Sequence, residues 1–296
     1  MALEHKPDHV PVEKKNLDYA HFRLETLSPH LGAEVYGLDL SRELTPSQDA
    51  ELRRAFLDWS VLVFPEQELL PEHHKALGAR FGELHVHPQL RNSDMQHPEV
   101  LPVVTNEHSP FTPGDGWHSD VTCDDIPPLG SMLYVREIPE CGGGDTLFCN
   151  MYAAYDLLSE PMQRFLEGLT AVHDGAGPYN EQAELLGLPT PEGGHPRTEH
   201  PCVIRHPETG KKVLYVNSGF TTRIVGLSAA ESRGLLDLLF RHVESNPKIW
   251  CRVSWKPHTL TFWDNRCVQH HAIWDYYPHT RVGGRVSILG TTRPAA

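Results

Sequence analysis

The chain has 296 residues, of which 39% are hydrophobic and 22% charged, and its formal net charge is −13 at pH 7. No apolar run approaches the roughly 18 residues that a membrane-spanning helix requires, so we expect no membrane partner. The acidic balance also argues against a nucleic-acid partner, because a phosphate backbone binds basic surfaces. A few arginines gathered in a pocket can still bind a small anion.

The length allows one large domain or two small ones. We predict a flexible N-terminal arm over residues 1–20, which has no signal-peptide core, and a single domain over residues 21–296. The six cysteines are scattered and include no Cys-x-x-Cys pair, which indicates a reducing, cytoplasmic environment. We further expect the chain to form a homo-oligomer.

The first predicted elements lie in "HLGAEVYGLDLSRELTPSQDAELRRAFLDWSVLVFPEQ", which contains a strand, a helix and a second strand. Thr45 and Gln48 form a capping box with Pro46 at the first helical position, and Leu52 and Phe56 lie on an apolar face. The run "SVLVFP" is typical of a buried strand, and "PEHHKALGARFG" predicts another helix.

The rest of the chain supplies mainly strands, predicted at "GSMLYVREI", "KKVLYVN", "CRVSWK", "TLTFWD" and "RVGGRVSILG". Ser228 and Glu231 box the start of a helix. One long helix is expected near residues 150–169. Residues 175–200, rich in Pro and Gly, predict an irregular insertion that could act as a lid. The fold class we predict is mainly β with flanking helices, as in a β-sandwich or jelly roll.

Candidate metal ligands lie in two distant segments. In "GWHSD", His118 and Asp120 are two residues apart, which places both side chains on one face of an extended strand. In "DNRCVQHHAIW", His270 or His271 offers a third ligand, and only one of them can join because neighbouring strand residues face opposite ways. Two histidines and one carboxylate are the ligand set of non-haem Fe(II) oxygenases.

Four motifs extend this pattern: "WHSD", "GGGDT", "VNSGFTTRIVGLS", and "WDNRCVQH" followed by "RVSILG". In this order and spacing they resemble the TauD/TfdA family of Fe(II)- and 2-oxoglutarate-dependent dioxygenases, most closely its taurine dioxygenase branch. The resemblance runs from about residue 25 to about residue 290 and leaves the arm and the insertion outside. It implies an oxidoreductase with a double-stranded β-helix (jelly roll) core.

The resemblance also implies the residues that hold the metal and the co-substrate. Fe(II) would be bound by His118, Asp120 and His270. The co-substrate 2-oxoglutarate would chelate the metal, and its far carboxylate would pair with Arg281 and Thr146, with dioxygen as the third reactant. A planar guanidinium suits this role because it binds a carboxylate by two parallel hydrogen bonds.

For the substrate, the resemblance implies three contacts with an anionic head group: His87, the Val121 backbone and Arg285. Phe220 is a candidate pocket wall, although an aromatic side chain in its motif is as typical of a core. Apart from the resemblance, His87 would be an ordinary strand residue and Arg285 a solvated strand charge.

Two positions depart from the taurine branch. Leu90 replaces a tyrosine and Gly114 an asparagine that in that branch contact the taurine amine. A pocket without these polar groups would leave an ammonium desolvated and unpaired, which costs several kcal/mol. We therefore predict a small anionic substrate with a less polar body, either an alkyl or aryl sulfonate or a sulfate ester. Taurine remains an alternative if Tyr179 or Glu181 in the insertion supplies new amine contacts.

The predicted reaction couples decarboxylation of 2-oxoglutarate to succinate and CO2 with hydroxylation of the carbon beside sulfur or the ester oxygen. Sulfite or sulfate then leaves with formation of an aldehyde. Three alternatives stay open. The same chemistry could act on an aryloxyalkanoate-like carboxylate. A cupin-like metal hydrolase would need no Arg281–Thr146 clamp. A non-catalytic binder of small anions would need no such set of three ligands.

Overall fold

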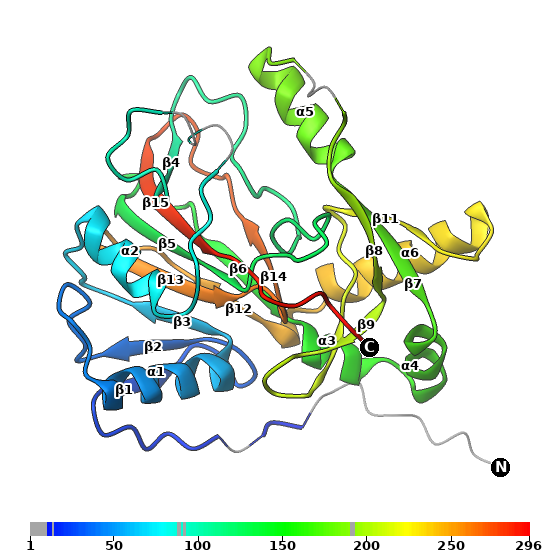
Figure 1. The fold of residues 1–296 in the computed structure, drawn as a ribbon, viewed down its shortest axis with the longest axis horizontal. Helices are drawn as coiled ribbons and strands as arrows, with labels where there is room; N and C mark the ends of the chain where they lie inside the picture. The colour runs from blue at the N-terminus through cyan, green and yellow to red at the C-terminus, as the bar shows by residue number, and fades with distance from the viewer. Residues whose placement is uncertain (1–10, 14, 88–89, 91–92, 190–192) are drawn as a thin grey trace.

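Two β-sheets carry the core of the protein (Figure 1). The computed structural model describes residues 11–13, 15–87, 90, 93–189 and 193–296. In the larger sheet, β1, β2, β3, β13, β5, β15 and β4 lie side by side in that order. Their bounds are β1 (Arg23–Thr26), β2 (Ala33–Tyr36), β3 (Val61–Phe64), β4 (Leu101–Thr105), β5 (Gly130–Glu137), β13 (Thr259–Asp264) and β15 (Arg281–Ile288).

The smaller sheet contains β12 (Trp250–Val253), β6 (Thr146–Asn150) and β14 (Val268–Ala272) in that order. The last four strands of the chain alternate between the sheets, because β12 and β14 belong to the smaller sheet and β13 and β15 to the larger. Phe148 and Trp263 meet between the two sheets, with ring centroids 5.6 Å apart. This alternation is that of a jelly roll and confirms the predicted fold class.

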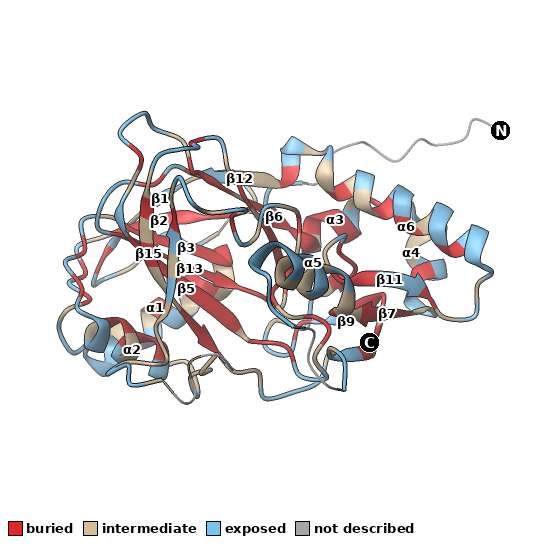
Figure 2. Ribbon diagram, turned by 90° about the horizontal axis from the view of Figure 1, so that it is seen from above, coloured by how far each residue is buried: buried red, intermediate tan, exposed pale blue. Residues whose placement is uncertain are grey.

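The central strands of the larger sheet are buried on both faces. Alternate residues of β3 belong to different core clusters: Val63 packs in the cluster shared with the smaller sheet, and Leu62 packs in the cluster on the outer face. All six residues of β13 are buried for the same reason. Figure 2 shows this burial through the central strands. A strand covered on both faces has an unbroken apolar run, as "SVLVFP" has.

Helices α1 (Pro46–Trp59) and α2 (Pro71–Ala79) cover the outer face of the larger sheet. The predicted capping box is confirmed, because the Thr45 hydroxyl accepts from the Gln48 N–H and the Gln48 side chain accepts from the Thr45 N–H. Phe56 of α1 stacks on Phe262 of β13 at a centroid distance of 3.9 Å.

A third layer stands beside the smaller sheet (Figure 1). Its strands form a three-stranded sheet in the order β11-β7-β8 and a hairpin of β9 and β10. The predicted capping box of Ser228 and Glu231 is confirmed at the start of α6. The bounds are β7 (Thr170–Asp174), β8 (Arg197–Pro201), β9 (Val203–Arg205), β10 (Lys212–Leu214), β11 (Thr221–Ile224), α6 (Ala229–Glu244) and the 3-10 helix η2 (Pro247–Ile249).

The single long helix expected near residues 150–169 is wrong. Two helices occupy this stretch, α3 (Met151–Leu157) and α4 (Glu160–Glu167). Leu158 is extended, and the hydroxyl of Ser159 caps α4. Pro161 in the first turn of α4 explains the break, because proline suits the start of a helix but cannot continue one.

The expectation of an irregular insertion over residues 175–200 is also wrong for its first half. Residues Ala176–Leu186 form the helix α5, and Gly187 ends it in a left-handed conformation with φ 63°. Pro178 lies in the first turn, where its missing N–H costs nothing, and a left-handed glycine is a common helix end. Residues 190–192 lie outside the described residues. A lid role for this segment stays a prediction.

The described part of the N-terminal arm contacts α1. The Lys15 ammonium lies 3.9 Å from the centroid of the Trp59 ring, and the Glu51 carboxylate accepts from the Ala20 and His21 N–H groups. Residues 1–10 and 14 of the predicted arm lie outside the described residues. Within the described ranges, no helix is both long enough and apolar enough to cross a membrane.

A buried ionic network closes the end of β13. The Asp264 carboxylate accepts from His206 at 3.0 Å and from Arg266 at 2.7 and 2.8 Å, and both Asp264 and His206 are 1% exposed. Burial opposes ionisation of Asp264, but Arg266 and His206 overcome it and lower the pKa to about 2.

We predict that Asp264→Ala lowers the free energy of unfolding by about 3–5 kcal/mol, because it removes the carboxylate that His206 and Arg266 share and leaves the mostly buried Arg266 guanidinium with Glu208 as its partner. The contribution of Asp264 is present above the pKa of an unfolded aspartate, about 4, and is lost as the pH falls towards the folded value. Urea unfolding at several pH values measures both effects. Asp39→Ala, which removes an exposed carboxylate paired with Arg42, is the control and should change stability by less than about 0.5 kcal/mol.

Candidate active site

A short backbone pairing places two histidines side by side. The N–H of His118 donates to the His270 carbonyl at 3.1 Å, and the N–H of His270 donates to the His118 carbonyl at 2.8 Å. Residues paired in this way across antiparallel strands point to the same face. The two imidazole rings are therefore neighbours, with centroids 4.2 Å apart.

Asp120 adds a carboxylate to this pair from the turn that follows His118. Its Oδ1 lies 3.7 Å from His118 Nε2 and 3.9 Å from His270 Nε2. Asn265 fixes the turn: its Oδ1 accepts from the Asp120 N–H at 2.6 Å, and its Nδ2 donates to the Asp120 carbonyl at 2.9 Å. Ser131 on β5 donates to the other carboxylate oxygen at 2.8 Å. The sequence analysis assigned no role in the site to Asn265 or Ser131.

The three side chains fit a divalent metal. Their candidate ligand atoms all lie within 4.8 Å of one another. Nδ1 of His118 lies 2.9 Å from the Gly116 carbonyl, which can only accept, so the Nε2 lone pair is left towards the cluster. Metal binding requires neutral imidazoles and an ionised carboxylate.

The pKa values favour that protonation state. Burial is the main cause that lowers the pKa of His118, and burial followed by the neighbouring His118 lowers that of His270 to about 3. Burial opposes ionisation of Asp120, but Arg285 and His270 outweigh it and hold the pKa of this carboxyl well below its usual range.

His271 lies on the other face of β14, as strand alternation requires. Its Nε2 lies 3.0 Å from the Asp115 carboxylate, and its ring packs edge-on against Trp117 at 5.7 Å. Of the two histidines that the sequence left open before the family resemblance, only His270 joins the cluster.

Arg281 is a buried cation at the start of β15, and it is 4% exposed. Its Nε and Nη2 have no hydrogen-bond partner among the described residues. Its guanidinium carbon lies 5.1 Å from the ring centroid of Trp255, and the Trp255 indole N–H donates to the Thr146 hydroxyl at 3.0 Å. The predicted pair of Arg281 and Thr146 is thus joined through one tryptophan, which sequence reasoning did not identify.

The environment of Arg281 fits a carboxylate ligand. Burial lowers the pKa of its guanidinium, and the nearby Tyr276 hydroxyl and Asp145 carboxylate offset this only in part. The "GGGDT" turn lies against this region: Gly144 has φ +72°, and a Cβ there would lie 3.1 Å from the Tyr276 ring. A buried guanidinium with free N–H groups is a binding site for a bidentate anion.

Arg285 lies four residues further along β15 and reaches the ligand cluster. Its Nη1 is 3.1 Å from Asp120 Oδ1, while its Nε lacks a partner in the described part of the chain. The register of β15 against β5 shifts between Val282 and Gly283. The shift lies at the start of the glycine pair Gly283–Gly284.

Of the other predicted substrate contacts, Val121 and Phe220 lie beside the cluster. Val121 directly follows Asp120 and has φ 51°, which is unusual for a β-branched residue. The Phe220 ring is 7% exposed and lies edge-on to His118 at 6.5 Å. His87 packs near His85, whose N–H donates to the carbonyl of Ser287 on β15.

Gly114, one of the two positions that depart from the taurine branch, lies against the cluster. Its φ is +85°, and an added Cβ would lie 3.2 Å from His118 Cε1. Its carbonyl accepts from the Ala272 N–H at 2.9 Å. Any side chain at this position would therefore border the metal ligands. Leu90, the second such position, is partly buried in the structure.

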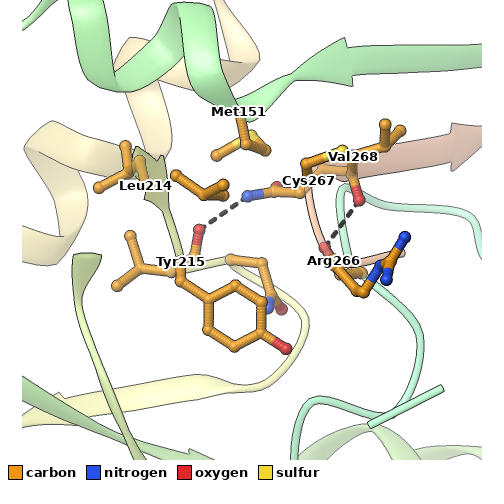
Figure 3. Close-up of a pocket in the computed structure, with 11 residues that line it drawn as sticks. Met151, Leu214, Tyr215, Arg266, Cys267 and Val268 are labelled. Atoms are coloured by element: carbon orange, nitrogen blue, oxygen red, sulfur yellow. Dashed lines mark hydrogen bonds between the residues drawn. The ribbon is translucent and has the colours of Figure 1, made fainter. Parts of the chain in front are cut away.

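The gap drawn in Figure 3 lies behind the cluster and is too narrow for a water molecule. Ser119, Cys267 and Gln269 line part of this gap. Ser119 and Gln269 are sequence neighbours of His118 and His270, so their side chains face away from the cluster. Burial raises the pKa of the Cys267 thiol, so this cysteine is unreactive. We assign the gap to packing.

Comparisons with known proteins agree with this geometry. Residues 23–292 match the family described as taurine catabolism dioxygenase TauD, TfdA family. A putative alpha-ketoglutarate-dependent sulfonate dioxygenase of Schizosaccharomyces pombe is 35% identical over 90% of this chain and 69% of its own. An alkylsulfatase of Acinetobacter baylyi is 35% identical over 93% and 87%. The crystal structure of a taurine dioxygenase from Burkholderia xenovorans has a TM-score of 0.78 and 38% identity, covering 93% of this chain and 91% of that one.

We predict that His118→Ala, Asp120→Ala and His270→Ala each strongly weaken binding of a divalent metal. Loss of a residue that only supports a ligand typically lowers the affinity roughly 10–100-fold, and loss of a ligand itself should lower it further. Calorimetric titration with Mn(II) measures the affinity without turnover. His271→Ala is the matched control, since its ring faces away, and should change the affinity by less than about twofold. Loss of metal binding in His271→Ala with retention in His270→Ala would contradict the assignment.

Proposed function

This chain belongs to the TauD, TfdA family of dioxygenases, and we propose that it is an Fe(II)-dependent member that hydroxylates a small anionic organosulfur compound. Family membership makes it an oxidoreductase that uses 2-oxoglutarate and a metal. A metal hydrolase and a non-catalytic anion binder, both open from the sequence, are therefore excluded. Iron and the class of substrate are the parts that we propose.

Fe(II) is the metal that best suits the ligand cluster. Two imidazoles and one carboxylate bind one face of this ion and leave its other positions open for co-substrate and dioxygen. His118, Asp120 and His270 would hold it, and Asn265 and Ser131 would keep the carboxylate oriented. When bound, iron supplies the reaction with dioxygen.

The observation that carries the proposal is the buried guanidinium of Arg281, whose Nε and Nη2 have no hydrogen-bond partner among the described residues. A buried cation without a partner is costly, so its place in the fold is best explained by a ligand anion. We assign it to the far carboxylate of 2-oxoglutarate, with the Thr146 hydroxyl as a second contact. Trp255 orients both groups through its ring face and its N–H.

The substrate head group would bind near Arg285. The Nε of this residue lacks a partner among the described residues, and Nη1 already contacts Asp120, so the guanidinium lies at the edge of the metal site. His87 and the Val121 backbone are proposed as further contacts of the head group. An anion held here places its neighbouring carbon beside the metal, which is what hydroxylation requires.

A sulfonate or a sulfate ester fits this arrangement best. Gly114 and Leu90 offer no polar side chain to an amine, and the relatives include a sulfonate dioxygenase and an alkylsulfatase. Hydroxylation of the carbon beside sulfur or the ester oxygen would release sulfite or sulfate with an aldehyde, while 2-oxoglutarate and dioxygen yield succinate and CO2. A carboxylate head group would also bind a guanidinium, and it is the second candidate.

We place the reaction in the cytoplasm. All six cysteines lie within the described ranges and are free, and five of them are buried. This usage supports a reducing compartment, because secreted proteins of this kind would form disulfides.

The experiment that tests the proposal has two steps. Anaerobic addition of Fe(II) and then 2-oxoglutarate should give a weak visible charge-transfer band, which reports chelation. In air, a panel of sulfonates, sulfate esters and carboxylates is then compared by succinate release. Sulfite or sulfate release from the best substrate supports the proposal. Highest turnover with taurine would contradict the argument from Leu90 and Gly114, and highest turnover with a carboxylate would contradict the organosulfur class.

We predict that Arg281→Ala raises the concentration of 2-oxoglutarate needed for half-maximal turnover by about tenfold to a hundredfold. Loss of a charge-assisted hydrogen bond costs about 1.5–3 kcal/mol. Thr146→Ala should have a milder effect because it removes a neutral hydroxyl. Succinate release at varied 2-oxoglutarate measures both, with Arg223→Ala, an exposed arginine on β11, as the control. An unchanged requirement in Arg281→Ala would show that the far carboxylate binds elsewhere.

A further inference from the structure

Helix α5 stands apart from the main sheets, above the ends of β7 and β8 (Figure 1). None of its eleven residues is fully buried among those that the structure describes. Leu185, Leu186 and Leu188 at its far end are about half exposed, at 48%, 50% and 47%. A helix with so little burial is held by few contacts, and the side chain that makes them matters.

Tyr179, in the first turn of α5, makes the contacts with the body of the protein. Its ring lies edge-on to Phe220 at a centroid distance of 6.0 Å, and its hydroxyl lies 4.0 Å from the Cys123 sulfur. On its outer side the ring packs near His195 at 5.4 Å. The Tyr179 ring therefore lies between His195 on its outer side and Phe220 and Cys123 on its inner side.

Gly175 leaves the room that this ring occupies. A Cβ at Gly175 would lie 2.8 Å from Cε2 of Tyr179 and 3.1 Å from the Cys123 sulfur. The backbone of Gly175 has φ −79°, which any residue can adopt. The close approach of Tyr179 and Cys123 therefore explains the glycine, and its backbone conformation does not require one.

The same ring is connected to the metal site by two routes. Phe220 lies between Tyr179 and His118, whose rings are each within 6.5 Å of it. Cys123 follows Val121 by two residues in the loop that begins at Asp120. Burial raises the pKa of the Tyr179 phenol, and the neighbouring Cys123 thiol adds to the shift, so the hydroxyl is neutral.

We propose that the Tyr179 ring, with Phe220 beside it and the buried Cys123 thiol packed behind it, forms the wall that contacts the apolar body of the substrate and so determines which chain lengths bind. The choice of an anionic head group rests on the proposed function. The wall itself rests on the ring contacts and on Gly175. Aromatic rings offer apolar surface, and each buried methylene of a ligand against such a surface should strengthen binding by about fourfold.

The test is a series of alkyl sulfonates of increasing length: ethane-, butane-, hexane- and octanesulfonate. They are titrated calorimetrically into the full chain loaded with metal and 2-oxoglutarate without oxygen. In the original chain, affinity should rise by about fourfold for each methylene that packs against the wall, and it should level off once the chain extends beyond the wall. In Tyr179→Ala the gain should fall below about twofold per methylene, while the affinity for ethanesulfonate changes little.

Two further variants separate a wall from a merely structural role. Gly175→Ala keeps the tyrosine but displaces its ring, so it should also reduce the gain per methylene. Tyr179→Phe keeps the ring and should retain the gain; a loss there equal to that of Tyr179→Ala would mean that the hydroxyl, and no apolar wall, makes the contact. Leu186→Ala, exposed on the same helix, is the control, and circular dichroism checks that each variant is folded.

The outcomes for the wall and for the proposed function are distinct. A flat affinity series in the original chain, or an unchanged gain in both Tyr179→Ala and Gly175→Ala, overturns the wall even if sulfonates are turned over. If the gain is present and is lost in Tyr179→Ala, but no sulfonate or sulfate ester supports succinate release, the proposed substrate class fails and the wall stands.

Discussion

The backbone pairing of His118 with His270 is the constraint on which the rest of the site depends. Two hydrogen bonds of 3.1 and 2.8 Å join a loop to a strand of the smaller sheet and set both imidazoles on one face. The chain must then turn at Asp120, and Asn265 fixes that turn through the Asp120 N–H and carbonyl. The ligand geometry is thus built into the jelly roll by ordinary sheet pairing, which spares the metal the cost of ordering its ligands.

The two arginines of β15 divide the tasks of the site because their partners differ. Arg285 contacts the Asp120 carboxylate, so its charge is partly compensated by the protein and it helps to keep that ligand ionised. Arg281 is buried, and two of its nitrogens have no partner among the described residues, so they can donate to an anionic ligand. In a chain with a net charge of −13, this local arrangement makes the pocket attractive to anions.

The fold could be predicted from the sequence where local signals were strong. The capping boxes at Thr45 and Ser228 and the buried strand β3 appear as expected. Errors arose where one residue ends an element: Pro161 starts a new helix within an apolar stretch, and Gly187 ends a helix within a segment rich in Pro and Gly. Proline and glycine occur both at the ends of helices and within irregular loops, and tertiary packing decides which of the two forms at a given position.

Spacing suggested that His118 and Asp120 share a face of one strand, but a turn at Asp120 brings them together instead. The order of the motifs identified the family and pointed to His270. The sequence also determined that Arg281 and Arg285 lie on one strand. Only the tertiary structure decided that Trp255 joins Arg281 to Thr146, that Asn265 holds Asp120, and that Tyr179 reaches Phe220 and Cys123. The reason is physical: periodicity fixes the direction of side chains within one element, whereas contacts between distant elements depend on how the sheets pack.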